Sequence, residues 1–335
     1  MHSIQALWDT PSSALRARLE SARHERAQGL AFFEVNSGKV DYLGSSGSGD
    51  LERALFRRLE RTPGMGWTLP DVVFFLNTLD EPRVFAHEKD VARSFSNVTT
   101  WQSYEPSSAT AELQKTCSQS QSSSRSGNAQ DHVRLSFISN TTESADYCLH
   151  PDLFQQHDFL QAPETFITTR DIIPVLSSCA AAHFSDIIIP SVYYELLQVQ
   201  DAASGLNPDL EPPWEDKEDV LYWSESSTGM HETTENWRTG HRQRLAMDLA
   251  LSSSGHRNVT LLTLGDSGWT PHPTEFARLS HFFDVSIRGI VQCDEPACAA
   301  MSAAFRSSVN DPAAKAFEYK FVLDIDGNTW SGRYH

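Results

Sequence analysis

Apolar residues occur along this chain in short continuous runs, separated by stretches in which apolar and charged residues are mixed. The clearest run is Asp71–Leu76, which is followed by the polar turn Asn77–Pro82. A continuous run of this length is typical of a strand that is buried on both faces, as in a parallel sheet. Further strands are predicted over residues 172–176, 186–190, 219–223 and 259–264.

One apolar stripe predicts an amphipathic helix over residues 12–31, with Ser12 or Ser13 as its N-cap. The stripe consists of Leu15, Leu19, Ala22, Ala27 and Leu30. Two more helices are predicted over residues 50–61 and 241–251. Strands that alternate with helices indicate an α/β protein.

Two segments of unusual composition divide the chain. Residues 103–131 are rich in Ser, Gln and Thr, which favours a mobile surface insertion. Residues 207–216 are rich in Pro and acidic residues, which is typical of a joint between domains. The sequence therefore predicts an N-terminal α/β domain over residues 1–210 and a second domain over residues 211–335.

The composition is that of a globular protein with a strong acidic excess. Of the 335 residues, 39% are hydrophobic, and 44 acidic residues against 27 basic ones give a formal charge of −17. No cluster of Lys and Arg stands out, so the composition argues against a nucleic-acid partner. No apolar stretch reaches the ~20 residues that span a bilayer, and no signal peptide is visible at the amino terminus.

The cysteines and sequons leave the cellular compartment open. Cys293 and Cys298 are close enough in sequence to close a small loop by a disulfide in an oxidising compartment. Neither this pair nor Cys148 with His157 has the ligand spacing of a zinc site. Three Asn-x-Ser/Thr sequons, about the number that chance gives in a chain this rich in Ser and Thr, lie at Asn97, Asn140 and Asn258.

Two acidic features could carry chemistry. Asp80 follows the strand predicted at residues 71–76, at the end where α/β sheets bind ligands, and could accept a proton there from a hydroxyl group. Taken alone, an Asp that caps the turn before Pro82 is the commoner reading. Asp324 and Asp326 could chelate a divalent cation, although two acids in a solvated turn are common. The chain has neither a G-x-S-x-G motif nor a phosphate-binding P-loop motif.

The last segment, Lys320–Arg333, is a strand-like run that leads into a polar turn with a lone arginine. This layout suits a strand whose carboxyl end delivers polar groups to a ligand crevice. Because the sequence stops two residues after Arg333, we expect the chain to be a truncated piece of a larger fold.

Taken together and in order, several segments resemble glycosyltransferase family 90, which comprises the fungal capsule-associated xylosyltransferases and the animal protein O-glucosyltransferases. The segments are Leu69–Asp71, Asn77–Val84, Phe184–Pro190, Trp214–Lys217, Leu221–Trp223, Ser227–Gly229, His241–Arg244, Phe283–Asp284, Gln292–Cys293 and Lys320–Arg333. They cover residues 60–335. The fungal members resemble the chain most, because of the residues at Asp80–Arg83 and Ser331–Arg333.

The resemblance implies a GT-B architecture, a pair of facing Rossmann-like domains of which the second is incomplete here. It implies inverting transfer of xylose or glucose from a UDP-sugar to a hydroxyl group of a glycan or glycoprotein acceptor, with no obligate metal, in the secretory pathway. Asp80 matches the family's general base, and Arg333 matches an arginine that contacts the nucleotide. The donor-binding segment also contains Ser226, Ser227, Thr228 and Gly229.

Two departures from the family pattern support an alternative. Where the family reads Trp-Arg-Gly-Ser, this chain has Ser224 and Glu225 after Trp223, which removes a cation and adds an anion near the donor phosphates. Each lost charged hydrogen bond to a buried phosphate costs ~1.5–3 kcal/mol. The family also continues beyond its final arginine. The alternative is a catalytically inactive truncated remnant, or a noncatalytic carbohydrate-binding protein.

Overall fold

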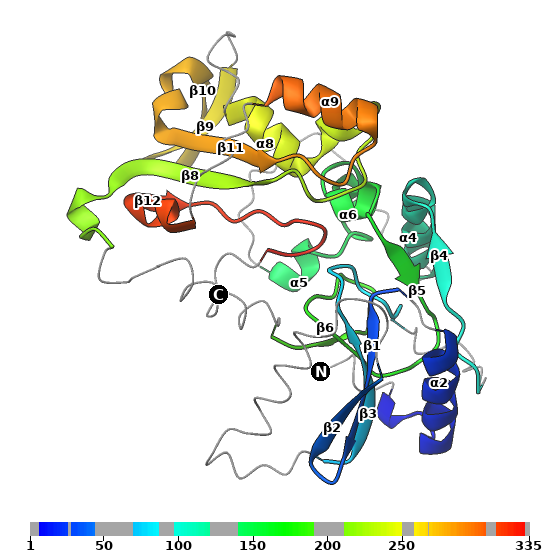
Figure 1. Cartoon of the computed structure of the whole chain (residues 1–335). Coiled ribbons are helices and arrows are strands. Elements are labelled where there is room, and N and C mark those ends of the chain that lie inside the picture. Colours follow the sequence, from blue (N-terminus) through cyan, green and yellow to red (C-terminus); the bar gives the residue numbers. More distant parts are fainter. Residues whose placement is uncertain are drawn as a thin grey trace. The chain divides into compact units, whose positions relative to one another are not determined.

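The protein is of the mixed α/β class, as predicted, and divides into two compact units (Figure 1). Residues 1–200 and 328–333 form the first unit, and residues 201–327 form the second. The computed structural model describes residues 7–25, 28–43, 70–86, 97–120, 140–190, 211–249, 258–266, 268–305 and 313–331. The helix predicted over residues 50–61 lies outside these ranges. The predicted boundary after residue 210 stays a prediction, because residues 191–210 also lie outside them.

The first unit is built on a five-stranded sheet with the order β2-β1-β3-β6-β7. Its strands are β1 (Leu30–Asn36), β2 (Lys39–Leu43), β3 (Val72–Asn77), β6 (Val175–Ser177) and β7 (Ile187–Ile188). Strands β3, β6 and β7 run parallel, whereas β1 is antiparallel to both β2 and β3. The β1–β2 hairpin turns at Ser37 and Gly38, whose φ angles of 52° and 73° belong to a two-residue turn that matches the twist of the strands.

The helix predicted over residues 12–31 is too long. Helix α2 ends at Glu25, and Leu30 already begins β1. Gly29, with a φ of 71°, turns the chain between them, and a Cβ there would lie 2.4 Å from the Leu79 side chain. The apolar residues from Leu30 onward are drawn into the sheet, where they gain partners on both faces.

Both faces of this sheet are packed. Leu19 and Ala22 of α2 (Ser12–Glu25) lie against Phe32 and Phe75 on one face. The opposite face buries Ala31, Phe33, Val35, Phe74 and Leu76. Because successive residues of β3 alternate between two apolar layers, its sequence is continuously apolar. The strand predicted at residues 71–76 is therefore confirmed as β3, but burial on both faces begins only at Phe74, since Val72 is 41% exposed.

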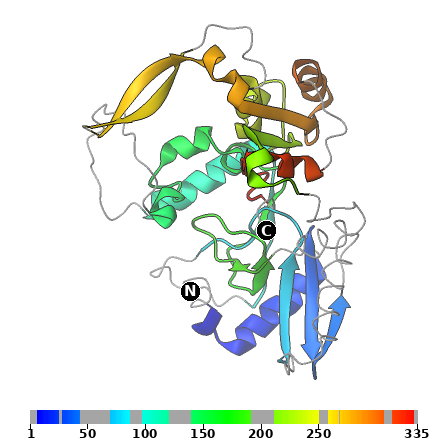
Figure 2. The same ribbon diagram turned by 90° about the vertical axis from the view of Figure 1, so that its left-hand side faces the viewer.

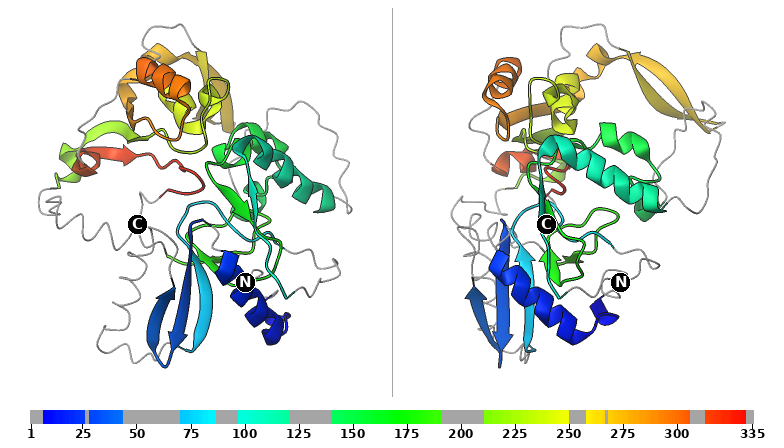
Figure 3. Two further views of the ribbon diagram at one scale, coloured as in Figure 1. Left: turned by 45° about the vertical axis from the view of Figure 1, so that its right-hand side comes forward. Right: turned by 90° about the vertical axis from the view of Figure 1, so that its right-hand side faces the viewer.

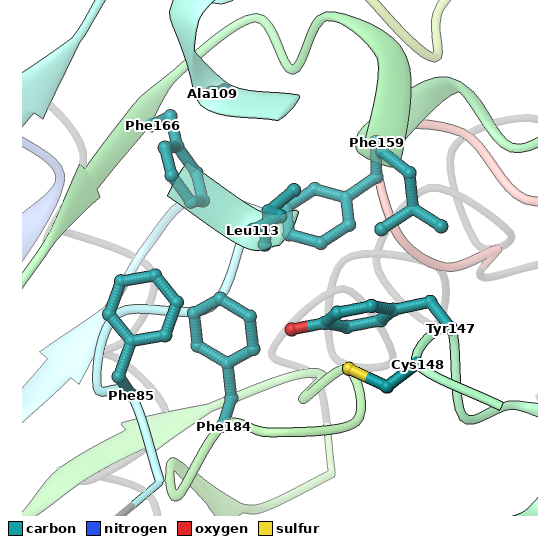
Figure 4. Packing of buried hydrophobic residues seen from close by; sticks show 9 residues of the cluster. Phe85, Ala109, Leu113, Tyr147, Cys148, Phe159, Phe166 and Phe184 are labelled. Carbon is teal, nitrogen blue, oxygen red and sulfur yellow. The ribbon is translucent and has the colours of Figure 1, made fainter. Parts of the chain in front are cut away.

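The first unit also contains a second core, under helix α4 (Pro106–Ser120). Figure 4 shows Leu113 and Ala109 of this helix among the rings of Phe159, Phe166 and Phe184. The core is completed by the short elements β4 (Gln102–Tyr104), β5 (Phe166–Thr168), α5 (Thr141–Ser144), α6 (Asp158–Gln161) and the 3-10 turn Pro151–Gln155. A disulfide between Cys117 and Cys148 ties α4 to the segment after α5.

This core corrects the prediction of a mobile insertion over residues 103–131. Residues 102–120 form β4 and α4, and Ala109 and Leu113 are fully buried. The Ser- and Gln-rich composition concealed an apolar stripe at a spacing of four residues, Ala109, Leu113 and Cys117. Residues 121–131 lie outside the described ranges.

The second unit is built on a three-stranded parallel sheet with the order β11-β8-β12. Its strands are β8 (Glu218–Ser226), β11 (Phe283–Gly289) and β12 (Tyr319–Val322). Trp223, Val285 and Ile287 of this sheet share one apolar cluster with residues of helices α8 (His241–Leu249) and α9 (Glu295–Ala304). Short 3-10 turns connect these elements at Trp214–Asp216, Trp237–Thr239, Phe276–Arg278, Ser280–Phe282 and Ala313–Glu318.

The strand predicted over residues 259–264 is present as β9 (Asn258–Gly265), but it does not join the parallel sheet. It pairs antiparallel with β10 (Gly268–Glu275) as a separate two-stranded hairpin. Figure 2 shows this hairpin, in yellow, projecting from the rest of its unit. No helix within the described ranges is long and apolar enough to cross a membrane.

Candidate functional sites

Asp80 lies three residues past β3, in a loop whose backbone is held by Asn77. The Asn77 amide nitrogen donates to the carbonyl of Glu81 (2.7 Å), and its oxygen accepts from the backbone N–H of Leu79 (3.2 Å). The backbone N–H of Thr78 donates to the carbonyl of Gly29 (2.9 Å). Buried at the end of β3, Asn77 thus gives the loop around Asp80 a fixed shape.

The Asp80 carboxylate accepts hydrogen bonds from two residues near the end of the chain. Trp330 Nε1 donates to Oδ1 (3.1 Å), and Asn328 Nδ2 donates to Oδ2 (3.3 Å). The Asp80 carbonyl accepts from the Thr329 hydroxyl and from the Cys179 thiol. One charged side chain at the end of a buried strand is thus oriented by side-chain donors on both oxygens, which is a stronger constraint than a turn cap alone supplies.

Cys179 is the free cysteine beside this loop. Burial raises the pKa of its thiol to about 12, although the Thr329 hydroxyl acts in the opposite direction. The thiol therefore stays protonated at neutral pH and donates to the Asp80 carbonyl. It has none of the thiolate character that a nucleophilic cysteine requires.

A buried polar network lies beneath the loop and is centred on Arg83, which is completely buried. The guanidinium donates to Asn77 Oδ1 (2.9 Å), the Ile167 carbonyl (3.1 Å) and the Gln28 carbonyl (3.1 Å). Burial lowers the pKa of Arg83, while the nearby Glu81 and Asp186 carboxyl groups act against that shift. The three guanidinium nitrogens of Arg83 donate to oxygens of three different segments. This one side chain therefore connects the end of β3 to β5 and to the residues just before β1.

Asp186 and Glu81 complete the network. The Asp186 carboxyl group accepts from the backbone N–H groups of Arg83 (2.9 Å) and Val84 (2.8 Å) and from the Ser177 hydroxyl (2.6 Å). The Glu81 carboxyl group accepts from the backbone and hydroxyl of Thr165. Burial raises the pKa of Glu81 above its ordinary value. Asp186 thus holds the backbone of the residues that follow the Asp80 loop, and Glu81 ties this loop to Thr165.

Burial also raises the pKa of Asp186 to about 6, from an ordinary value of 3.8. A carboxyl group with a higher pKa in the folded chain takes up a proton on folding, so its stabilising contribution is complete below pH ~4 and is lost as the pH rises through ~6. Relative to Asp186→Asn, we expect the wild-type free energy of unfolding to fall by ~2 kcal/mol between pH 4 and pH 7. Denaturant titrations of both proteins across this range measure the difference. Parallel pH curves would contradict the prediction.

In the second unit, the predicted donor-binding residues follow the carboxyl end of β8. Ser226 is the last residue of that strand, and its hydroxyl pairs with that of Thr228 (3.1 Å). Ser227 is fully buried. Its hydroxyl donates to the Val291 carbonyl (3.0 Å) and accepts from the Val291 backbone N–H (3.0 Å). The backbone N–H of Gly229 donates to the side chain of Gln292 (3.3 Å). Ser227 and Gly229 are therefore buried and hold the loop in place, whereas Ser226 and Thr228 are partly exposed.

Arg242, on the first turn of α8, is hydrogen-bonded to this loop. Its guanidinium donates to the Ser226 carbonyl (3.1 Å) and the Thr228 hydroxyl (2.8 Å). It also donates to the carbonyls of Ile325 (3.0 Å) and Asp326 (2.8 Å), beyond β12. The side chain is 5% exposed. One buried positive charge thus lies at the carboxyl ends of two parallel strands, together with the amino terminus of a helix.

The two residues that depart from the family pattern have different environments. Ser224 is 2% exposed, and its hydroxyl contacts that of Ser286 on β11 (2.9 Å). Glu225 is 31% exposed, and its carboxylate lies 4.0 Å from the Arg242 guanidinium. Ser224 is thus buried within the sheet, whereas Glu225 is partly exposed and lies beside Arg242. Arg333 lies outside the described residues.

Two groups could suggest a metal site. Asp324 and Asp326 are both exposed, and the Asp326 carbonyl is engaged by Arg242 and His241. Asp146, Cys148 and His183 lie close together, but the Cys148 sulfur is bonded to Cys117 and therefore offers no thiolate. His183 instead contacts Asp146 Oδ1 through Nε2 (2.8 Å). Neither group forms a complete set of ligands.

Sequence reasoning singled out Asp80 and the loop after β8, but it missed the residues that hold them. Arg242 lies in a segment that carried the family resemblance without being given a role. Asn328 and Trp330 lie in the polar turn of the last segment, and their position after β12 was the available signal. Comparison of the chain with protein-family models, curated proteins and solved structures gave no match. The class defined by fold and site is an α/β protein with polar sites at the carboxyl ends of parallel strands.

Proposed function

We propose that the protein is a glycosyltransferase of the family 90 type, which transfers xylose or glucose from a UDP-sugar to an acceptor hydroxyl with inversion. The proposal includes a GT-B arrangement of the two units, a glycan or glycoprotein acceptor and the secretory pathway as its location. The observation that carries it is the oriented carboxylate of Asp80, placed just past β3 by Trp330 and Asn328.

In this proposal Asp80 acts as the general base. The acceptor oxygen attacks the anomeric carbon of the donor sugar, and Asp80 takes the hydroxyl proton as that bond forms. The bond from the anomeric carbon to the phosphate oxygen breaks on the opposite side, and UDP leaves with its electron pair. A carboxylate whose direction is fixed by two donors needs little reorganisation for this step.

The departing diphosphate has to be stabilised by groups of the second unit, because no metal is part of the proposal. The loop offers the partly exposed hydroxyl groups of Ser226 and Thr228, and the start of α8 directs the positive end of its dipole to the same region. Arg242 adds a fixed positive charge beneath the loop. Its own donors are engaged by protein oxygens, so it acts through its field and by shaping the loop.

One observation favours the alternative, a catalytically inactive truncated remnant or a noncatalytic carbohydrate-binding protein. Glu225 adds an anion 4.0 Å from Arg242, at the end of the strand that would receive the diphosphate. Calorimetric titration with UDP separates the two functions. Micromolar affinity supports the transferase, whereas the absence of binding, together with specific binding of a glycan, supports the alternative.

A single substitution tests whether Glu225 opposes the nucleotide. We expect Glu225→Gln to raise the affinity for UDP by ~3–10-fold, because one unit of like charge near the phosphates is removed. Glu218→Gln is the matched control, since Glu218 is an exposed acid at the opposite end of the same strand. The gain should shrink at high salt. Equal affinities of the two variants would remove Glu225 from the donor site.

A further inference from the structure

The β9–β10 hairpin is a sheet of only two strands, and most of its residues are exposed. Among the described residues β9 pairs only with β10. The right-hand view of Figure 3 shows the two strands extending from their unit. An isolated two-stranded hairpin is only marginally stable in water and usually gains stability from a further strand or a packed face.

One face of the hairpin is apolar along its length. The register pairs Leu264 with Trp269, Leu262 with Pro271 and Thr260 with Pro273, and alternate residues of a strand share a face. Leu264 is 67% exposed and Trp269 is 53% exposed. This face therefore leaves large apolar side chains in water, as is typical of an interaction surface.

Two prolines close one edge of the hairpin. Proline has no N–H, so pairing that continues through Pro271 and Pro273 requires both residues to face away from β9. The outer edge of β10 thus lacks donors at two alternate positions and is a poor template for another strand.

The same register leaves the outer edge of β9 with N–H and C=O groups that can pair with another strand. In an antiparallel pair, the N–H and C=O groups of two opposite residues point either toward each other or both outward. Because Pro271 and Pro273 point outward, their partners Leu262 and Thr260 direct their N–H and C=O groups to the outer edge of β9. Asn258 and Leu264 share that direction. This edge has no proline and no charged residue from Asn258 to Gly265, within a chain of formal charge −17.

We propose that the outer edge of β9 pairs antiparallel with β9 of a second copy of this chain, which forms a dimer with a continuous four-stranded sheet. Most surfaces of so acidic a chain repel their own copies, whereas this uncharged strand allows two copies to approach to strand distance. Antiparallel pairing about a two-fold axis places Leu261 opposite its own copy, Thr260 opposite Leu262 and Asn258 opposite Leu264. Every outward-facing residue of the strand then has a partner, as a self-complementary interface requires.

The test is the mass of the full chain in solution, measured by sedimentation at concentrations of about 1–100 μM. The wild type should show a concentration-dependent shift toward twice the chain mass of 37.4 kDa. Leu261→Lys should remain a monomer, because two like charges then lie directly opposite each other. Thr270→Lys, which adds the same charge to the closed strand β10, should dimerise like the wild type. A monomeric wild type, or equal dimerisation of both lysine variants, would overturn the proposal.

A second test of the proposal uses a variant that should form larger assemblies than the wild type. Replacing Pro271 and Pro273 together by threonine restores the missing donors and opens the edge of β10. Each copy then has two open edges, so the dimer should grow into larger assemblies. Leu262→Pro in the same background should limit growth by closing the edge of β9. A double threonine variant that stays at the wild-type mass would contradict the assignment of the edges.

Discussion

Replacing Arg83 by leucine is expected to reduce the free energy of unfolding of the first unit by ~3–5 kcal/mol. The arginine is completely buried, and its guanidinium binds oxygens of Asn77, Gln28 and Ile167. A leucine removes a donor from each of these three buried oxygens, and it removes the positive charge near the buried Glu81 and Asp186 carboxyl groups. Denaturant unfolding of the full chain, followed by tryptophan fluorescence, measures the loss.

Arg170→Leu is the matched control for Arg83→Leu. The Arg170 guanidinium also pairs with a carboxylate, Glu112 (2.7 Å), but its side chain is 45% exposed. Glu112 is only 9% exposed, but it keeps a second ion pair to Lys115 (2.8 Å) when Arg170 is removed. We therefore expect a change of only ~0–1 kcal/mol. Arg83→Lys should fall between the two, because a lysine keeps the charge but not the planar fork. Equal losses for Arg83→Leu and Arg170→Leu would show that the buried network does not support the loop.

The Asp80→Asn variant is expected to reduce sugar transfer by ~10²–10⁴-fold while leaving UDP affinity unchanged. The amide cannot accept the hydroxyl proton, whereas its oxygen can still accept from Trp330 Nε1. The amide nitrogen then faces Asn328 Nδ2, so two donors meet. Asn328 Oδ1 is buried without a partner among the described residues, and a rotation of the Asn328 amide brings it toward the new donor. The fold around position 80 should therefore survive the change.

Sugar release from a panel of UDP-sugars, with and without acceptors, measures the effect of Asp80→Asn. Asp71→Asn is the control, because Asp71 lies just before the opposite end of β3 and accepts from the backbone N–H of Ser37 (2.6 Å). It should leave transfer unchanged. Near-normal turnover of Asp80→Asn would exclude Asp80 as the base, and loss of UDP binding by that variant would show that the residue has a structural role instead.

Elements that are determined by local pattern could be predicted from the sequence. The strand at residues 71–76 was predicted from its continuous apolar run, and α8 lies within the helix predicted over residues 241–251. The end of α2 could not be found in this way, because Leu30 fits a helical stripe as well as a strand. Helix α4 was missed because its Ser, Gln and Thr residues outnumber the few apolar side chains that anchor it.

In the candidate sites, too, residues marked by a local pattern could be found from the sequence, and residues brought together from distant segments could not. Asp80 could be predicted, because its place after a buried strand is a local feature. Its two donors are separated from it by 248 and 250 residues, so no local pattern could indicate them. The same holds for Asp186, which binds the backbone of Arg83 from 103 residues away. Such contacts arise only when segments that are far apart in the sequence meet in the folded chain, and no local pattern in a single sequence records that meeting.

The disulfide between Cys117 and Cys148 closes a covalent ring over a sequence separation of 31 residues. Closing a ring of this size removes ~3–4 kcal/mol of chain entropy from the unfolded state. It also changes what a single proteolytic cut means for this molecule. A peptide bond broken between the two cysteines leaves both fragments joined through sulfur, so the nicked chain migrates as one molecule until a reductant separates its halves. The helix on one side and the Phe-rich core on the other can thus stay assembled after the backbone between them has been cut.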